Sequence, residues 1–212
     1  MQWTLVIPLK SLVRAKSRLT ATAGDGQRPG LALAFAQDTV AAALACAAVR
    51  DVAVVTDDAR AGRELSALGA RIVADEPGTG LNAALTHAAT AVRAARGKSP
   101  LAALNADLPA LRPSELARVL DAAAEFPRAF LADAAAIGTT LLTAAPGREL
   151  RPAFGPDSRS RHLASGATEL LLEAVDSVRR DVDTGDDLRT ALALGVGSHT
   201  AAVTARLLIT GQ

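Results

Sequence analysis

The stretch LAALNADLP, residues 101–109, joins a four-residue apolar run to a polar loop that carries Asp107. A short apolar run bounded by chain-breaking residues is typical of a buried strand, and this one ends at the loop of residues 105–109, which closes with Pro109. Similar short runs alternate with longer helical patterns along the rest of the chain. The alternation predicts an α/β fold in which helices flank a mostly parallel sheet. Because the sequence shows no repeat and no linker, we expect a single domain over residues 1–212.

The apolar periodicity places the expected elements along the chain. Strands are predicted at residues 4–8, 52–56, 71–74, 101–104, 129–133, 139–142 and 178–182. Helices are predicted at residues 31–49, 58–68, 80–96, from 113 onward, 161–167 and 184–194. The glycine-rich, polar residues 10–30 are predicted to form a long loop. The β-prone tail, residues 200–209, is predicted to add a strand or to contact a second subunit.

Composition excludes several classes of protein. Half of the 212 residues are apolar and 21% are charged, which is typical of a folded chain with a real core. The net charge of +1 offers no basic face to nucleic acid, and the single cysteine, Cys46, excludes a disulfide framework. The N-terminus has no signal-peptide pattern, and the alanine-rich stretches are too short to span a membrane. We therefore expect a cytoplasmic protein.

Charged side chains follow several of the predicted strands. Ligands of open parallel sheets bind at the C-terminal ends of the strands. The residues at these ends are Lys10, Lys16, Arg18, Asp57, Asp58, Asp75, Glu76, Asp107, Asp181 and Asp183. Cations at one strand end and carboxylates at several others suit a polyphosphate bound with a divalent metal, because Mg²⁺ is typically held by one or two carboxylates plus phosphate oxygens.

Missing motifs narrow the chemistry further. The sequence contains no Walker A pattern, no G-x-G-x-x-G after the first strand and no G-x-S-x-G nucleophile elbow. The three histidines, His87, His162 and His199, lack zinc-ligand spacing. Phosphoryl or nucleotidyl transfer is the chemistry that remains.

A series of short motifs resembles the 2-phospho-L-lactate / phosphoenolpyruvate guanylyltransferases of coenzyme F420 biosynthesis. The motifs come in the family's order and span nearly the whole chain. They are IPLK (7–10), AKSRL (15–19), VTDD (55–58), GLNAAL (80–85), ADLPAL (106–111), GTTLL (138–142), FGPDS (154–158), RH (161–162), GA (166–167) and DVDT (181–184).

The resemblance implies a glycosyltransferase-A-like nucleotidyltransferase fold and a defined reaction. Such an enzyme uses GTP and Mg²⁺ to transfer GMP to the phosphate of phosphoenolpyruvate or 2-phospho-L-lactate, releasing pyrophosphate. The acceptor phosphate is itself an anionic nucleophile, so no general base is required. The alanine- and arginine-rich composition is typical of the GC-rich genomes of actinobacteria. The resembled family is associated with phosphoenolpyruvate in those organisms, which favours it as the acceptor.

The resemblance also assigns roles to individual residues. Asp107 and Asp183 would ligate Mg²⁺, with Asp181 as a reserve ligand, and Asp107 and Lys16 would be the catalytic residues. The nucleotide and its phosphates would be bound by Lys10, Lys16, Arg18, Gly80 and Asn82. The acceptor would be bound by Thr140, Gly155 and Ser158, the last at the start of a short helix.

Several alternatives remain open at this point. Asp183 could instead cap the following helix, Asn82 could merely begin one, and Arg161 with His162 could approach the acceptor carboxylate or form a surface pair. The segment DAAAI, residues 133–137, stands before Gly138 where the family pattern has another glycine, and this departure leaves the acceptor undecided.

Two rival hypotheses concern the whole protein. The first is another nucleotidyltransferase of this fold, of the molybdenum-cofactor or sugar-phosphate type. The second is a non-catalytic nucleotide-binding protein. A homodimer and a functional coupling to the next enzyme of F420 synthesis are also left open.

Overall fold

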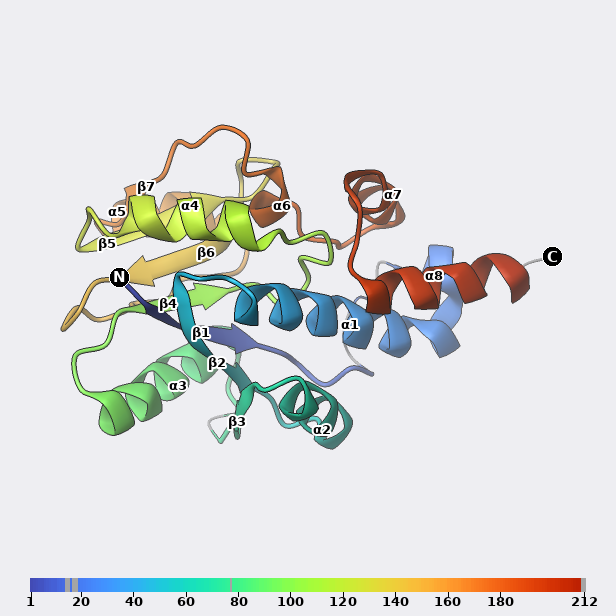
Figure 1. Cartoon of the computed structure of the whole chain (residues 1–212), viewed down its shortest axis with the longest axis horizontal. Coiled ribbons are helices and arrows are strands. Elements are labelled where there is room, and N and C mark those ends of the chain that lie inside the picture. Colours follow the sequence, from blue (N-terminus) through green and yellow to red (C-terminus); the bar gives the residue numbers. More distant parts are fainter. Residues whose placement is uncertain (14–15, 17–18, 77, 211–212) are drawn as a thin grey trace.

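In the computed structural model, the described residues are 1–13, 16, 19–76 and 78–210. Within them, seven strands form one sheet in the order β3-β2-β1-β4-β6-β5-β7. Strands β1, β2, β3 and β4 pair in parallel, β6 runs antiparallel to both of its neighbours, and β7 pairs in parallel with β5. The predicted α/β fold with a mostly parallel sheet between helices is confirmed (Figure 1).

The elements follow the predicted alternation closely in the first two thirds of the chain. The strands are β1 (Trp3–Pro8), β2 (Val49–Val55), β3 (Arg71–Val73), β4 (Leu101–Leu104), β5 (Arg128–Ala132), β6 (Thr139–Ala144) and β7 (Thr168–Glu169). The helices are α1 (Thr20–Leu44), α2 (Ala59–Ala67), α3 (Leu81–Arg96), α4 (Pro113–Ala123), α5 (Ser158–Ala164), α6 (Asp176–Arg179), α7 (Gly185–Leu194) and α8 (Ser198–Thr210).

Two apolar layers cover the two faces of the sheet. Successive side chains of a strand point to opposite faces. In β1, Leu5 and Ile7 accordingly join the cluster formed with α1, α2 and α4, whereas Val6 joins the cluster formed with α3. A third cluster packs α7 against α1 beyond the end of the sheet. Because both faces are covered, β1 is buried along nearly its whole length.

The predicted loop at residues 10–30 is wrong in its second half, because α1 already begins at Thr20 and contains Pro29 and Gly30. Local propensity argued against a helix there. Packing overrides that propensity: Leu31 and Phe35 are fully buried against residues of α7, and α8 lies along α1 (Figure 1). The helix also ends earlier than predicted, at Leu44.

The predicted strand at 178–182 is also wrong. Residues Asp176–Arg179 form the short helix α6 instead. The backbone N–H and hydroxyl of Ser177 both donate to one carboxylate oxygen of Glu115 on α4, at 2.9 and 2.8 Å, which holds this segment away from any strand ladder.

The C-terminal tail is a helix rather than the predicted strand. Helix α8 spans Ser198–Thr210, and its first turn is held by the buried Asp38 of α1. That carboxylate accepts hydrogen bonds from the backbone N–H groups of His199 and Thr200 at 3.0 and 2.8 Å. No helix in the described part of the chain is both long and apolar enough to cross a bilayer.

Candidate active site

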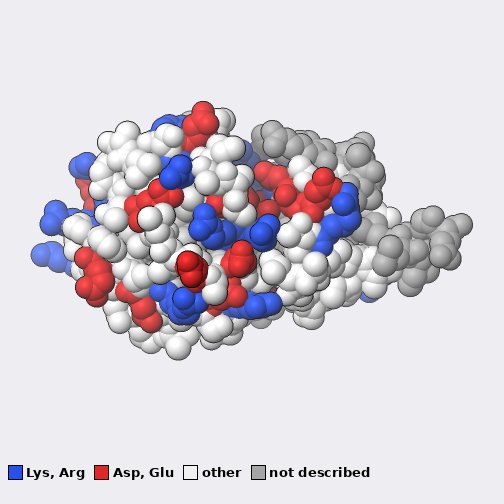
Figure 2. All heavy atoms as spheres, turned by 90° about the horizontal axis from the view of Figure 1, so that it is seen from above, with Lys and Arg blue, Asp and Glu red and all other residues white. Residues whose placement is uncertain are grey.

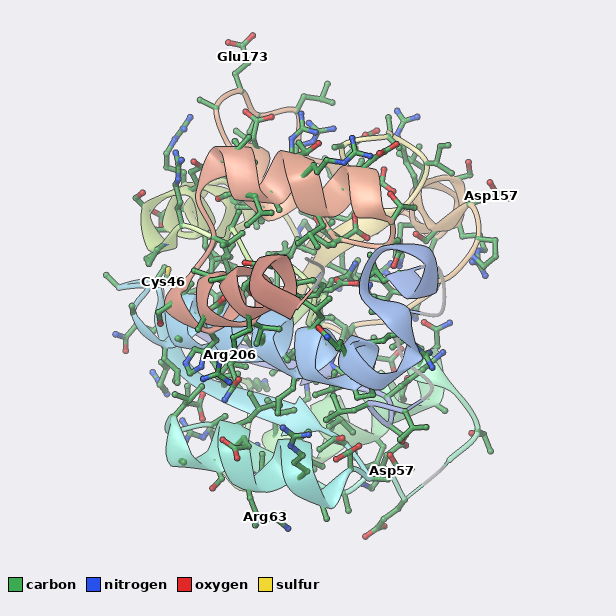
Figure 3. The ribbon with its side chains drawn as sticks, turned by 90° about the vertical axis from the view of Figure 1, so that its right-hand side faces the viewer. Cys46, Asp57, Arg63, Asp157, Glu173 and Arg206 are labelled. Carbon is green, nitrogen blue, oxygen red and sulfur yellow. The ribbon has the colours of Figure 1, made fainter. Side chains whose placement is uncertain are left out.

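The candidate site lies at the edge of the sheet where the parallel strands end. Strands β1 and β4 point toward the same side of the molecule in Figure 1, and Figure 3 looks onto that side. Strand β6 runs the other way, so it begins at this edge, and its Thr140 carbonyl accepts a hydrogen bond from the Asn105 N–H after β4 at 2.9 Å. The antiparallel strand thus brings Thr140 beside the loop that carries Asp107.

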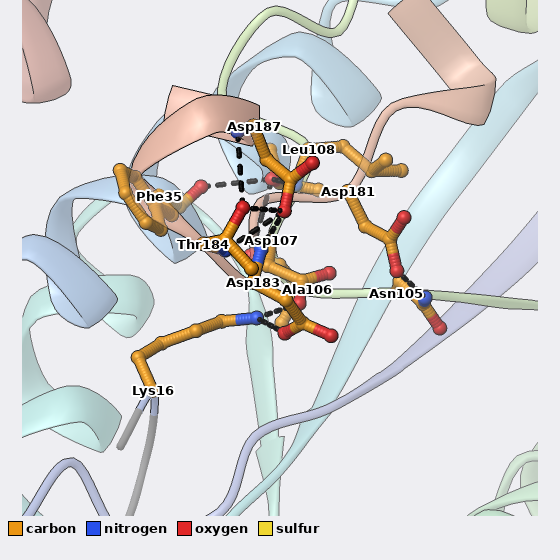
Figure 4. A network of polar contacts seen from close by, with 11 residues as sticks. Lys16, Phe35, Asn105, Ala106, Asp107, Leu108, Asp181, Asp183, Thr184 and Asp187 are labelled. Atoms are coloured by element: carbon orange, nitrogen blue, oxygen red, sulfur yellow. Dashed lines mark hydrogen bonds and ion pairs between the residues drawn. The ribbon is translucent and has the colours of Figure 1, made fainter. Parts of the chain in front are cut away.

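Helix α1 fixes the loop that carries Asp107. The Thr39 hydroxyl, fully buried, accepts a hydrogen bond from the Leu108 N–H at 3.0 Å. It lies 3.2 Å from the Ala106 carbonyl oxygen and donates to the Phe35 carbonyl at 2.8 Å (Figure 4). Both neighbours of Asp107 are therefore tied to the body of the protein, so its carboxylate has a defined position.

Asp183 reaches Asp107 through a backbone bond between their segments. The Val182 N–H donates to the Asp107 carbonyl at 3.0 Å. The following helix, α7, is capped by Thr184 and Asp187, whose side chains bond reciprocally to each other's backbone N–H groups. Because these two residues form the cap, the Asp183 side chain is not used for capping and stays half-exposed.

Lys16 contacts both carboxylates. Its ammonium forms an ion pair with Asp107 and lies 2.6 Å from Oδ1 of Asp183 (Figure 4). Burial of the Lys16 side chain favours its neutral form, but the charges and hydrogen bonds of the two aspartates outweigh burial and raise its pKa above the ordinary value. Lys16 therefore stays protonated, and its positive charge lies between Asp107 and Asp183.

Asp181 lies to one side of this group, next to Asn105 (Figure 4). Its carboxylate is within 3.4 Å of the Asn105 amide nitrogen (Figure 4). Burial, followed by the negative charges of Asp107 and Asp183, raises the pKa of Asp181 to about 7. A cavity of about 230 Å³ borders Asp181 and Asp183 and is also lined by Asp133 and Asp187.

The carboxylates suit a divalent metal whose coordination is completed by a substrate. Oδ1 of Asp107 is buried and has no hydrogen-bond partner among the described residues, so this oxygen is available to coordinate a metal ion. Among the described residues, no three His, Cys, Asp or Glu side chains are placed so that they could hold a metal ion together. Two carboxylates without a full protein cage match Mg²⁺, which keeps open positions for water and phosphate oxygens.

Thr140, Gly155 and Ser158 lie on two segments near this edge. Thr140 is fully buried, and its hydroxyl makes no hydrogen bond within the described structure. Gly155 adopts φ +117°, which favours glycine, and its carbonyl accepts the N–H of the buried Ser158 at 3.2 Å. The start of α5 is tied to the loop before β6 by a bond from the Arg159 N–H to the Ile137 carbonyl.

The other predicted nucleotide residues are spread along the same edge. Gly80 precedes α3 at φ +121° and is exposed, as is Lys10, which follows β1. Arg18 lies outside the described residues. Asn82 uses its amide for two hydrogen bonds to the backbone of Phe154, far along the chain. The structure thus brings Lys16, Asp107, Asp181 and Asp183 together and places Asn82 against the segment that precedes Gly155.

His162 is a buried structural residue. It is fully buried, with both ring nitrogens engaged by Thr139 and Ala153, so it forms no surface pair with Arg161 and has no ring nitrogen left for an acceptor carboxylate. Its partners lie 23 and 9 residues away in the sequence, and no local signal reveals them.

A larger cavity, of about 490 Å³, lies at the opposite edge of the sheet around Arg128 and Arg148. The guanidinium of Arg128 donates hydrogen bonds to the carbonyl oxygens of Leu150, Arg151 and Ser165. None of the predicted site residues that the structure describes lines this cavity. On the face shown in Figure 2, acidic and basic side chains are interspersed.

Comparisons with known proteins identify the family of the chain. The family model described as "Guanylyl transferase CofC like" matches residues 3–210. The phosphoenolpyruvate guanylyltransferase of Streptomyces coelicolor is 80% identical over 212 residues, covering 100% of both chains. That of Streptomyces avermitilis is 79% identical and covers 100% of this chain and 98% of its own.

Solved structures show the same fold at low identity. A nucleotidyl transferase from Methanothermobacter superposes with a TM-score of 0.63 at 22% identity, covering 91% of this chain and 97% of that one. The protein Rv0371c of Mycobacterium tuberculosis, solved in complex with manganese, has a TM-score of 0.56 at 22% identity, covering 91% and 99% of the two chains. The glycosyltransferase-A-like nucleotidyltransferase fold is confirmed.

Proposed function

The chain belongs to the guanylyl transferase CofC-like family, and from this premise we propose that it transfers GMP from GTP to the phosphate of phosphoenolpyruvate. It is a nucleotidyltransferase, and its close relatives make it a guanylyltransferase. The observation that carries the proposal is the meeting of Lys16 with Asp107 and Asp183 at the end of the parallel strands. The pathway served is coenzyme F420 synthesis in the cytoplasm.

The proposed reaction is a single displacement at phosphorus. An oxygen of the acceptor phosphate forms a bond to the α-phosphorus of GTP, and the bond from that phosphorus to the bridging oxygen of the β-phosphate breaks. Pyrophosphate leaves with the electron pair. Because the nucleophile is already anionic, the protein is required to position and neutralise charge rather than to remove a proton.

Asp107 and Asp183 are the residues that would hold Mg²⁺. When bound, the metal supplies positive charge that offsets the triphosphate and the departing pyrophosphate. Lys16 supplies a second, fixed positive charge at the same place, and its raised pKa keeps it protonated throughout the neutral range. Lys10 and Arg18 are proposed to bind the outer phosphates, and Gly80 to allow the nucleotide a close approach to the backbone before α3.

Thr140, Gly155 and Ser158 are proposed to bind the acceptor. A buried hydroxyl without a partner in the described structure, that of Thr140, is a suitable donor to a phosphate or carboxylate oxygen. The relatives' name supports phosphoenolpyruvate as this acceptor. 2-Phospho-L-lactate has the same two anionic groups and is the comparison substrate.

A direct test follows the phosphorus atoms. The protein is incubated with GTP, Mg²⁺ and phosphoenolpyruvate, and ³¹P NMR monitors the formation of a new phosphorus–oxygen–phosphorus linkage together with pyrophosphate. We expect both signals with GTP, and much weaker ones when ATP or CTP replaces it. Linkage formation with ATP at an equal rate, or none with GTP, would contradict the proposal.

A further inference from the structure

Asn82 holds a segment that lies far from it in the sequence. Its amide nitrogen donates to the Phe154 carbonyl at 3.0 Å, and its amide oxygen accepts the Phe154 N–H at 2.8 Å, across 72 residues. Asn82 is the second residue of α3, and the N-terminus of that helix has no side-chain cap. Its amide therefore serves the remote segment rather than its own helix end.

His162 contacts the same segment through bonds of its own. Its Nε2 accepts the Ala153 N–H at 3.0 Å, so in the neutral ring the proton is on Nδ1, which donates to the Thr139 hydroxyl at 2.9 Å. The ring packs edge-on against Phe154, with centroids 5.1 Å apart. Burial, with the charges of Arg128 and Arg161, lowers the pKa of His162 to about 4, which keeps this arrangement intact at neutral pH.

The groups held by these two side chains directly precede the proposed acceptor residues. Ala153 and Phe154 come immediately before Gly155, and Thr139 immediately before Thr140. His162 also belongs to α5, the helix that Ser158 begins. Two buried or half-buried side chains thus connect β6, the segment 153–158 and α3 into one unit.

We propose that Asn82 and His162 are positioning residues that hold Thr140, Gly155 and Ser158 in the arrangement that binds the phospho-acid, an inference that rests on the proposed function. Without the clamp, the segment 153–158 has more conformations available, and binding must then order it. Such ordering weakens affinity for the ligand that this segment contacts and leaves other ligands unaffected.

A rival role for Asn82 is direct contact with guanine or ribose. After the two bonds to Phe154, one N–H and one lone pair of the amide remain. The two roles predict opposite results, because direct contact concerns GTP and positioning concerns the acceptor.

The decisive variant is Asn82→Ala. We expect the KM for phosphoenolpyruvate to rise about tenfold, which corresponds to roughly 1.4 kcal/mol, with kcat and the KM for GTP within about twofold of wild type. Thr90→Ala is the matched control, because it removes an exposed hydroxyl from the same helix. A raised KM for GTP, or an unchanged KM for phosphoenolpyruvate, overturns the positioning role.

Hydrogen exchange supplies a readout that does not depend on turnover. The Phe154 amide is protected in wild type by the Asn82 oxygen, so we expect it to exchange faster in Asn82→Ala while the α3 amides keep their protection. Unchanged exchange at Phe154 overturns the clamp itself. If wild type releases no pyrophosphate with any acceptor, the proposed function fails. If wild type is active and only the Asn82 results disagree, only the positioning role fails.

Discussion

Nζ of Lys16 lies 2.6 Å from Oδ1 of Asp183, a residue 167 positions later in the chain, and the same ammonium is paired with Asp107. Lys16 adopts φ +57°, a backbone conformation rarely used by residues other than glycine. A cation that binds the two carboxylates must compete with this ammonium, which already offsets part of their negative charge. On the proposed function, the triphosphate of GTP would take over the ion pairs of Lys16 and leave Asp107 and Asp183 to hold Mg²⁺.

Replacing Lys16 should thus have opposite effects on metal binding and on turnover. In Lys16→Met without substrates, we expect Mn²⁺ to bind at least about tenfold more tightly, since the competing charge is gone. Turnover should fall, because the triphosphate loses a cation. Electron paramagnetic resonance measures the Mn²⁺ affinity, and Lys98→Met, an exposed lysine elsewhere, is the control. Weaker Mn²⁺ binding together with wild-type turnover would contradict this account.

Asp107→Ala should abolish most of the activity without unfolding the protein. The loop around it is held by Thr39 and by backbone bonds that the substitution leaves in place. Loss of a group that stabilises transition-state charge typically costs about 10²- to 10³-fold in rate, and we expect a loss of that order. Circular dichroism checks the fold, and Asp186→Ala on the exposed face of α7 is the control. Near wild-type rates in Asp107→Ala would remove it from the metal site.

Ser158→Ala should act on the acceptor alone. A hydrogen bond to a charged group is worth about 1.5–3 kcal/mol, so we expect the KM for phosphoenolpyruvate to rise by about tenfold or more while the KM for GTP is unchanged. Steady-state kinetics with each substrate varied in turn measures both values. Ser160→Ala, which removes an exposed hydroxyl from the same helix, should behave as wild type. An equal rise in both KM values would place Ser158 elsewhere.

His162 should make the stability of the protein depend on pH. Burial lowers its pKa to about 4 in the folded state, against about 6.5 when unfolded. Between these values the unfolded chain binds the proton and the folded chain does not, so stability is complete above pH 6.5 and is lost as the pH falls toward 4. The contribution is about 3 kcal/mol.

Denaturant unfolding of wild type and His162→Asn at pH 4 and pH 7 tests this dependence. We expect the difference in unfolding free energy between the two proteins to shrink by about 3 kcal/mol on going from pH 7 to pH 4. The paired comparison is needed because the raised pKa of Asp181 acts in the opposite direction, favouring the folded state at low pH. A difference that stays constant with pH would show that His162 titrates normally in the folded protein.

The sequence predicted the elements whose signals are local. The strand before Asp107, the helix predicted over residues 58–68 and the start of α4 at Pro113 are all as expected. Asp58 caps the second of these, α2, by accepting hydrogen bonds from the N–H groups of Arg60 and Ala61. Strand ends of a parallel sheet converge, which predicted that Lys16 and Asp107 lie at one place. Asp183 joins them although its predicted strand is absent, because the Val182 N–H bonds to the Asp107 carbonyl.

The elements that were missed depend on packing between remote segments. Helix α1 begins among glycines and Pro29 because it packs on α7 and α8, and α8 is a helix whose first turn Asp38 holds. The bonds from Asn82 to Phe154 and from His162 to Ala153 likewise join segments that no periodicity relates. The sequence therefore identified Lys16, Asp107 and Asp183 as site residues. The contacts that Asn82 and His162 make with the segment before Gly155 are seen only in the structure.

The central claim is most directly tested by measuring pyrophosphate release from GTP and Mg²⁺ in three parallel reactions, with phosphoenolpyruvate, with 2-phospho-L-lactate and without an acceptor. Asp107→Ala serves as the blank in each reaction. We predict release that depends on phosphoenolpyruvate and is absent from the blank. Release that is equally fast without an acceptor, or no release with either acid, would contradict the account.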